Sequence, residues 1–100
     1  MNAPFRTYNE RCFVLPKISI ITKSRIVAMM LRFDLLKVEA ELAMRLADGM
    51  ELMEAGQKMG YTDGSTRTFS KRIYSKLGVH TQAQLVSVVY KFILESYNLH

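Results

Sequence analysis

The sequence predicts an all-α fold, and two kinds of observation support this. Apolar residues recur at intervals of three and four over most of residues 34–97, which is the spacing of one face of an α-helix. Residues that begin or end helices also bracket these stretches: Thr62 can cap a first turn, and Gly49 and Gly78 can follow a last one. We therefore expect one domain with four helices over residues 34–97, preceded by a short N-terminal extension, residues 1–33.

The N-terminal extension has the weakest pattern. Residues 1–11 are polar, and two short apolar runs follow at residues 12–15 and 18–21, separated by a proline. The β-branched residues of these runs favour extended structure. Ser24 is placed to cap a helix that continues to about Arg32.

The first helix of the domain is expected to run from a cap at Asp34 to about Asp48. Leu35, Leu42 and Leu46 recur on it at helical spacing. A second helix is expected over residues 51–59, followed by a tight turn. Its apolar stripe consists of Leu52, Ala55, Gly56 and Met59. The two small residues of this stripe allow another helix to approach closely.

The helix expected over residues 62–77 is the one most suited to recognising another molecule. At about 100° per residue, Arg67, Thr68 and Lys71 fall on one side of it. The opposite side consists of Thr66, Ser70, Ile73 and Leu77. A face with little apolar bulk and many cationic and hydroxyl donors suits the major groove of DNA. The alternative is the solvated face of an ordinary surface helix.

The last helix, from a cap at Thr81 to about Tyr97, is apolar over a wider arc than one core-facing stripe needs. Its only charged residues are Lys91 and Glu95. A surplus apolar face on a terminal helix indicates a partner surface, so we expect self-association. The residues expected at that dimer interface are Leu85, Val89, Phe92 and Ile93. The alternative is that the N-terminal third of the chain covers this face.

The charge permits a polyanionic partner. The formal net charge is +5 and the isoelectric point is about 9.6, with the basic excess in residues 1–34 and 62–100 and an acidic middle. A single cysteine, Cys12, excludes an internal disulfide and fits a reducing cytoplasm. With His80 and His100 it makes no metal-binding set, so no metal or cofactor is expected.

Other classes of function receive little support. The sequence contains no apolar stretch of membrane-spanning length and no continuous apolar segment typical of a secretion signal. It also lacks a paired acid and base, or a nucleophile with a base, so we do not expect an enzyme.

Several short segments agree, in register and without gaps, with one family pattern. Leu35 to Glu39 stands where that pattern has Leu-Thr-x-x-Glu. Residues 54–62 are similar to Glu-Ile/Ala-Ala-x-x-Leu-Gly-Ile-Ser, and residues 71–79 to Lys-x-Ile-x-x-Lys-Leu-Gly-Val. Residues 34–94 thus resemble the LuxR-type (GerE-like) DNA-binding domain.

The resemblance implies a four-helix domain that binds double-stranded DNA through its third helix and commonly dimerises through its fourth. The base-reading residues that it implies are Arg67, Thr68 and Lys71. The DNA phosphate contacts are expected from Thr62, Ser65, Arg72 and Lys76. The chain departs from the family pattern at Leu36, which replaces a capping threonine, and at Phe69, where the family often has histidine. Residues 1–33 have no counterpart.

We therefore expect a cytoplasmic, homodimeric helix-turn-helix transcriptional regulator that binds specific DNA sequences. Two alternatives stay open. A stand-alone interaction protein could pair with a full-length LuxR-type regulator and silence it. A fragment resembling the promoter-reading part of a sigma factor has a similar helix-turn-helix, but the long apolar fourth helix argues against it.

Overall fold

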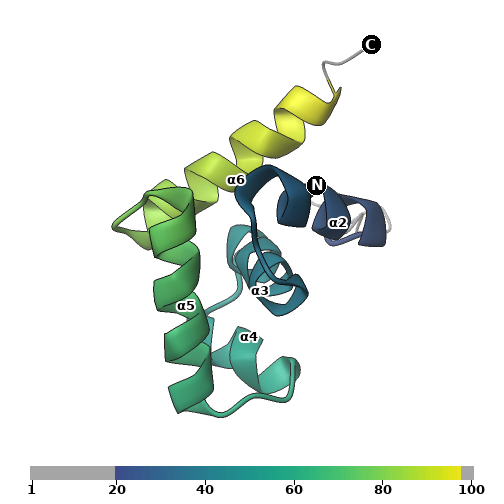
Figure 1. The fold of residues 1–100 in the computed structure, drawn as a ribbon. Helices are drawn as coiled ribbons and strands as arrows, with labels where there is room; N and C mark the ends of the chain where they lie inside the picture. The colour runs from purple at the N-terminus through teal and green to yellow at the C-terminus, as the bar shows by residue number, and fades with distance from the viewer. Residues whose placement is uncertain (1–19, 98–100) are drawn as a thin grey trace, which may run out of the picture.

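The computed structural model describes residues 20–97, which form five helices and no strand (Figure 1). The helices are α2 (Lys23–Phe33), α3 (Lys37–Ala47), α4 (Leu52–Lys58), α5 (Asp63–Leu77) and α6 (Gln82–Tyr97). The all-α prediction is confirmed for this part of the chain. The extended structure expected for residues 12–15 and for most of 18–21 lies outside the described residues.

The start of the helical region differs from the prediction. Thr22, not Ser24, caps α2, and its Oγ1 accepts the backbone N–H of Arg25 at 3.2 Å. Asp34 does not begin the next helix. It ends α2 in the left-handed conformation, with φ 58°, and its N–H donates to the carbonyl of Met30. The prediction of a cap at Asp34 is therefore wrong.

The helix α3 begins two residues later than expected, at Lys37, with Leu36 in place of Asp34 at the cap position. A leucine side chain cannot accept a hydrogen bond, so Leu36 cannot cap the helix with its side chain. Glu39, in the first turn of α3, provides the side-chain acceptor at this end instead. Its Oε1 accepts the N–H of Leu36 at 2.9 Å. The end of α3 agrees with the sequence, because Gly49 has φ 96° two residues after Ala47.

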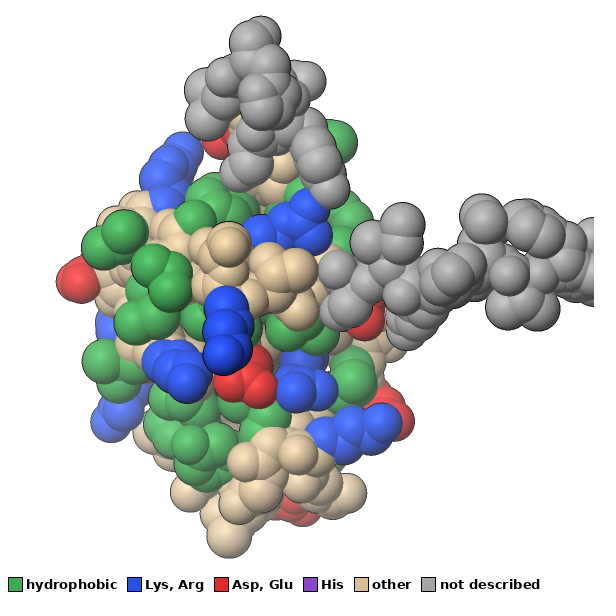
Figure 2. Space-filling view, turned by 90° about the vertical axis from the view of Figure 1, so that its right-hand side faces the viewer, with side chains coloured by type: hydrophobic (Ala, Val, Ile, Leu, Met, Phe, Trp, Pro, Cys, Tyr) green, Lys and Arg blue, Asp and Glu red, His purple; other side chains and the backbone are tan. Residues whose placement is uncertain are grey.

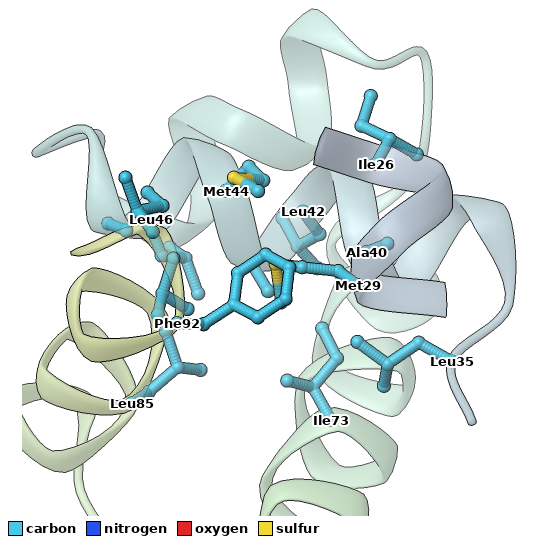
Figure 3. Close-up of a cluster of buried hydrophobic side chains, with 14 of the residues drawn as sticks. Ile26, Met29, Leu35, Ala40, Leu42, Met44, Leu46, Ile73, Leu85 and Phe92 are labelled. Atoms are coloured by element: carbon cyan, nitrogen blue, oxygen red, sulfur yellow. The ribbon is translucent and has the colours of Figure 1, made fainter. Parts of the chain in front are cut away.

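The helix α3 lies at the centre of the fold and packs against α2, α5 and α6 (Figure 1). Seven of its eleven residues are buried, which is far more than one helical stripe. Figure 3 shows buried side chains from all four of these helices meeting in one cluster, including Met29, Leu42, Ile73 and Leu85. The position of every other helix is set by contact with α3 or, for α4, also by contact with α5.

The four residues predicted at a dimer interface belong to this core. Leu85 and Val89 have no exposed surface, Ile93 is 4% exposed and Phe92 is 9% exposed. Phe92 also packs edge-to-face against Phe33 of α2, with ring centroids 5.8 Å apart. Side chains buried in their own protomer cannot face a partner, so this prediction is wrong. The cover on this side of α6 comes mainly from α3, and among the described residues of the N-terminal third, Phe33 of α2 packs against it.

Candidate nucleic-acid interface

The helix α5 begins and ends where the sequence predicts. The Thr62 hydroxyl accepts the N–H of Ser65 at 3.1 Å and donates to its side-chain oxygen, also at 3.1 Å. At the other end Gly78 adopts a left-handed conformation, with φ 71°, and its N–H bonds to carbonyls of the last turn. Both ends of the helix are therefore fixed. The Thr62 hydroxyl, predicted as a phosphate contact, is already engaged in the cap.

A close contact between α4 and α5 fixes how the two helices cross. A Cβ atom added to Gly56 would lie 2.7 Å from Cγ2 of Thr66, which is closer than real atoms approach. Thr66 is 1% exposed, and its hydroxyl donates to the carbonyl of Thr62 at 2.8 Å, so its side chain has little freedom to move. The close approach predicted at the small residues of α4 is therefore present. In the intervening turn, Tyr61 packs edge-to-face on Phe69, with centroids 5.1 Å apart.

One side of α5 faces solvent along the whole helix, and we call it the outer face. Its exposed residues are Gly64, Arg67, Thr68, Lys71, Arg72 and Ser75. At about 100° per residue, Arg67 and Arg72 lie on the two edges of this face. The middle between them holds small side chains and Lys71. The structure thus brings together the three residues predicted to read bases, all of them exposed.

The middle of the outer face holds small side chains, although packing within the described protein does not require small residues there. Beyond the adjoining residues and the backbone of its own helix, no atom lies within 4 Å of a Cβ built on Gly64, although glycine is a poor helix former. The Thr68 hydroxyl donates to the Gly64 carbonyl at 3.1 Å, so it lies against the helix backbone. Another surface can therefore approach the start of α5 closely.

The cations of the outer face are not neutralised by any residue that the structure describes. Among the described residues, neither Arg67, Lys71 nor Arg72 takes part in an ion pair. The only acidic residue of α5 is Asp63, in the first turn, where a carboxylate favours the helix dipole. The outer face therefore presents positive charge to a partner over most of its length.

Lys76 has a different role from the predicted phosphate contact. Its Nζ lies 2.8 Å from Oε1 of Glu39, a carboxylate that is fully buried, while the Lys76 side chain is 33% exposed. The other Glu39 oxygen has no hydrogen-bond partner. The ammonium thus balances an interior charge and ties the end of α5 to α3, a role that the predicted phosphate contact did not include. The sequence feature that points to this pair is Glu39, because a glutamate on the apolar stripe of α3 becomes buried and needs a cationic partner.

A hollow of about 620 Å³ borders the C-terminal half of the outer face. It lies beside Lys71 and Ser75 and continues to His80 in the turn before α6. Ser70, which the helical wheel placed at the edge of the buried face, lines the hollow and is half-buried. The surface beside this part of α5 is therefore concave and partly polar.

A second exposed surface is an apolar stripe on α6. Tyr90 is 42% exposed, Leu94 is 59% exposed, and the half-buried Val86 precedes them at the same four-residue interval. We call these three residues the α6 stripe; it runs beside the core face of the helix, and Val86, at its edge, also packs against the core. The surplus of apolar residues noted in the sequence is real, but it lies at other positions than those predicted.

Comparison with known proteins finds no family model, no curated protein and no solved structure that matches the chain. The likeness to the LuxR-type domain therefore rests on the residues quoted above. Within residues 20–97, no helix is long and apolar enough to cross a membrane. The same part of the chain contains no cluster of three or more His, Cys, Asp or Glu side chains that could hold a metal ion.

Proposed function

We propose that this protein binds double-stranded DNA in a sequence-dependent manner, with α4 and α5 acting as a helix-turn-helix and α5 in the major groove. The observation that carries the proposal is the outer face of α5, where Arg67 and Arg72 flank a strip of small residues that also holds Lys71, and none of the three is paired with a described residue. The helix has 15 residues, so it is about 22 Å long. The major groove is about 12 Å wide and accepts a helix of ordinary diameter.

The side chains of the outer face suit different parts of the duplex. Arg67 can donate two hydrogen bonds to O6 and N7 of a guanine, and Lys71 makes a less directional contact. The Thr68 hydroxyl is bonded to the helix backbone, which leaves its methyl group to meet a thymine methyl. Arg72 lies on the other edge of the face and is placed to meet phosphate, which contributes affinity without reading sequence.

We also propose that two copies associate through the α6 stripe. A twofold contact brings the same patch of both protomers together, so Tyr90 and Leu94 of each protomer would be buried at the interface. Two bound recognition helices would then be spaced by about one helical turn of DNA, roughly 34 Å. This arrangement replaces the interface predicted from the sequence.

The test begins with selection of bound duplexes from a random library, which also reveals half-site spacing. On the selected duplex, Arg67→Ala is expected to weaken the binding free energy by about 1–3 kcal/mol and to relax the preference at one base position. Its affinity for a scrambled duplex should change little. Arg72→Ala is expected to weaken both duplexes equally and to lower the salt slope by about 1. Lys91→Ala, on α6, serves as the control. An equal loss on both duplexes for Arg67→Ala would contradict its role in base reading.

A second candidate function is a stand-alone interaction protein that pairs with a LuxR-type regulator and silences it. The observation that favours it is the α6 stripe, which could pack against a helix of such a regulator as well as against α6 of a second copy. A stable heterodimer that binds no duplex would support this candidate. Salt-dependent binding of a selected duplex by the purified protein would support the DNA-binding function instead.

A further inference from the structure

Two hollows adjoin on the side of the molecule that carries α2, and Lys37 lines both of them. The first has a volume of about 340 Å³ and is lined by Lys23, Ile26, Val27, Met30 and Lys37. The second has a volume of about 430 Å³ and is lined by Leu36, Lys37, Val38, Glu41, Met59 and Tyr61. We call the two together the Lys37 surface. It draws residues from α2, α3, the end of α4 and the turn before α5, and its α2 part lies across the fold from α5 (Figure 1).

The Lys37 surface exposes large apolar side chains. Val27 and Leu36 are each 53% exposed and Tyr61 is 38% exposed. Leu31, which is 82% exposed, follows Val27 by one helical turn on the same side of α2. Single exposed apolar residues are ordinary, but several around adjoining hollows mark an interaction site.

The same surface carries unpaired positive charge. Lys23 and Lys37 are exposed, and neither forms an ion pair with a described residue. The one carboxylate of the surface, Glu41, is bound to Arg45 at 3.1 Å. Figure 2, which views the molecule from this side, shows hydrophobic side chains with Lys and Arg side chains between them and an acidic side chain beside the central ones. A partner for this surface therefore needs apolar groups together with negative charge.

We propose that the Lys37 surface docks an acidic, amphipathic segment of another protein. Apolar side chains on one side of the segment enter the two hollows, and its carboxylates meet Lys23 and Lys37. A second copy of this chain fits poorly, because a twofold contact would place the same lysines of both copies at one interface. A nucleic acid fits poorly as well, because its phosphate backbone has no apolar side chains for the hollows. The proposal does not depend on DNA binding by α5.

The test uses two labelled synthetic peptides with leucines at i, i+3, i+4 and i+7, one with glutamates at the flanking positions and the other with lysines. Binding to the full chain is followed by fluorescence anisotropy, and the site is mapped by amide chemical shifts. The acidic peptide is expected to bind at least about tenfold more tightly than the basic one, which corresponds to about 1.4 kcal/mol. The shifts are expected at α2, the start of α3 and the α4–α5 turn.

A matched pair of double variants separates a specific site from general attraction to a basic protein. Lys23→Glu with Lys37→Glu is expected to weaken the acidic peptide at least about tenfold and to favour the basic one. Lys71→Glu with Lys91→Glu changes the net charge equally and is expected to have a small effect. Equal weakening by both pairs would overturn the proposal. So would the absence of binding by the acidic peptide, or shifts confined to α6 or to the outer face of α5.

Discussion

Replacing Lys76 with methionine is expected to reduce the free energy of unfolding by about 3 kcal/mol, although this lysine lies at the edge of α5. The substitution keeps the aliphatic stem and removes the ammonium that lies 2.8 Å from the Glu39 carboxylate. Removal of one partner from a buried ion pair costs about 3–5 kcal/mol. We take the lower end because the Lys76 side chain is 33% exposed, so water already screens part of the attraction.

Glu39 explains why the loss is not smaller. Its carboxylate is fully buried, and without Lys76 its only hydrogen-bond donor would be the N–H of Leu36 at 2.9 Å. A loss of about 3 kcal/mol corresponds to a fall in Tm of about 12–24 °C for a domain of this size. Urea and thermal unfolding, followed by circular dichroism, measure both quantities.

The matched control is Arg72→Met, which removes a cation from the exposed side of the same helix. It is expected to change stability by about 0.5 kcal/mol or less. The double variant Glu39→Gln with Lys76→Met should regain most of the loss, because the glutamine oxygen can still accept the N–H of Leu36 and no charge is left buried. A loss below about 1 kcal/mol for Lys76→Met, similar to that of Arg72→Met, would refute the reasoning and favour the predicted phosphate contact for Lys76.

Three further substitutions test other parts of the structure. Gly56→Ala is expected to destabilise by about 1–3 kcal/mol through overlap with Thr66, and Thr66→Ala in the same chain should relieve part of that loss in urea unfolding. Leu94→Asp is expected to leave a folded protein that sediments as a monomer, whereas Val89→Asp, at a core position, should unfold the chain. A Leu94→Asp variant that still dimerises would contradict the role of the α6 stripe. Gly64→Ala should stabilise by up to about 1 kcal/mol yet weaken binding of the selected duplex, and unchanged affinity would show that nothing approaches this glycine.

The helix α5 could be predicted because local interactions define it. Thr62 and Gly78 bond to the backbone within a few residues of themselves, so they mark the ends of the helix whatever surrounds it. The polar and apolar sides of α5 are separated clearly enough that its exposed face follows from the helical period alone. The exposure of Arg67, Thr68 and Lys71 therefore required no knowledge of the other helices.

The predictions that failed depend on long-range packing. The wide apolar arc of α6 did not reveal which of its positions enter the core, because that is decided by where α3 and α2 lie. Asp34 has a residue type suited to a helix start, yet the same residue type also tolerates the left-handed conformation that ends α2. The partner of Lys76 is 37 residues away in the sequence, so no local pattern on α5 revealed it.

The composition of α5 makes its position depend on contacts with the rest of the fold. The helix contains a glycine and several threonines and serines, which are weak helix formers. Three contacts compensate: the Thr62 cap at its start, the Gly56–Thr66 contact in its first half, and the Glu39–Lys76 pair near its end. Variants at these contacts should therefore lose stability and affinity for all duplexes together. Variants of the outer face should lose affinity while stability is retained, and this difference separates residues that position the helix from the residues proposed to read DNA.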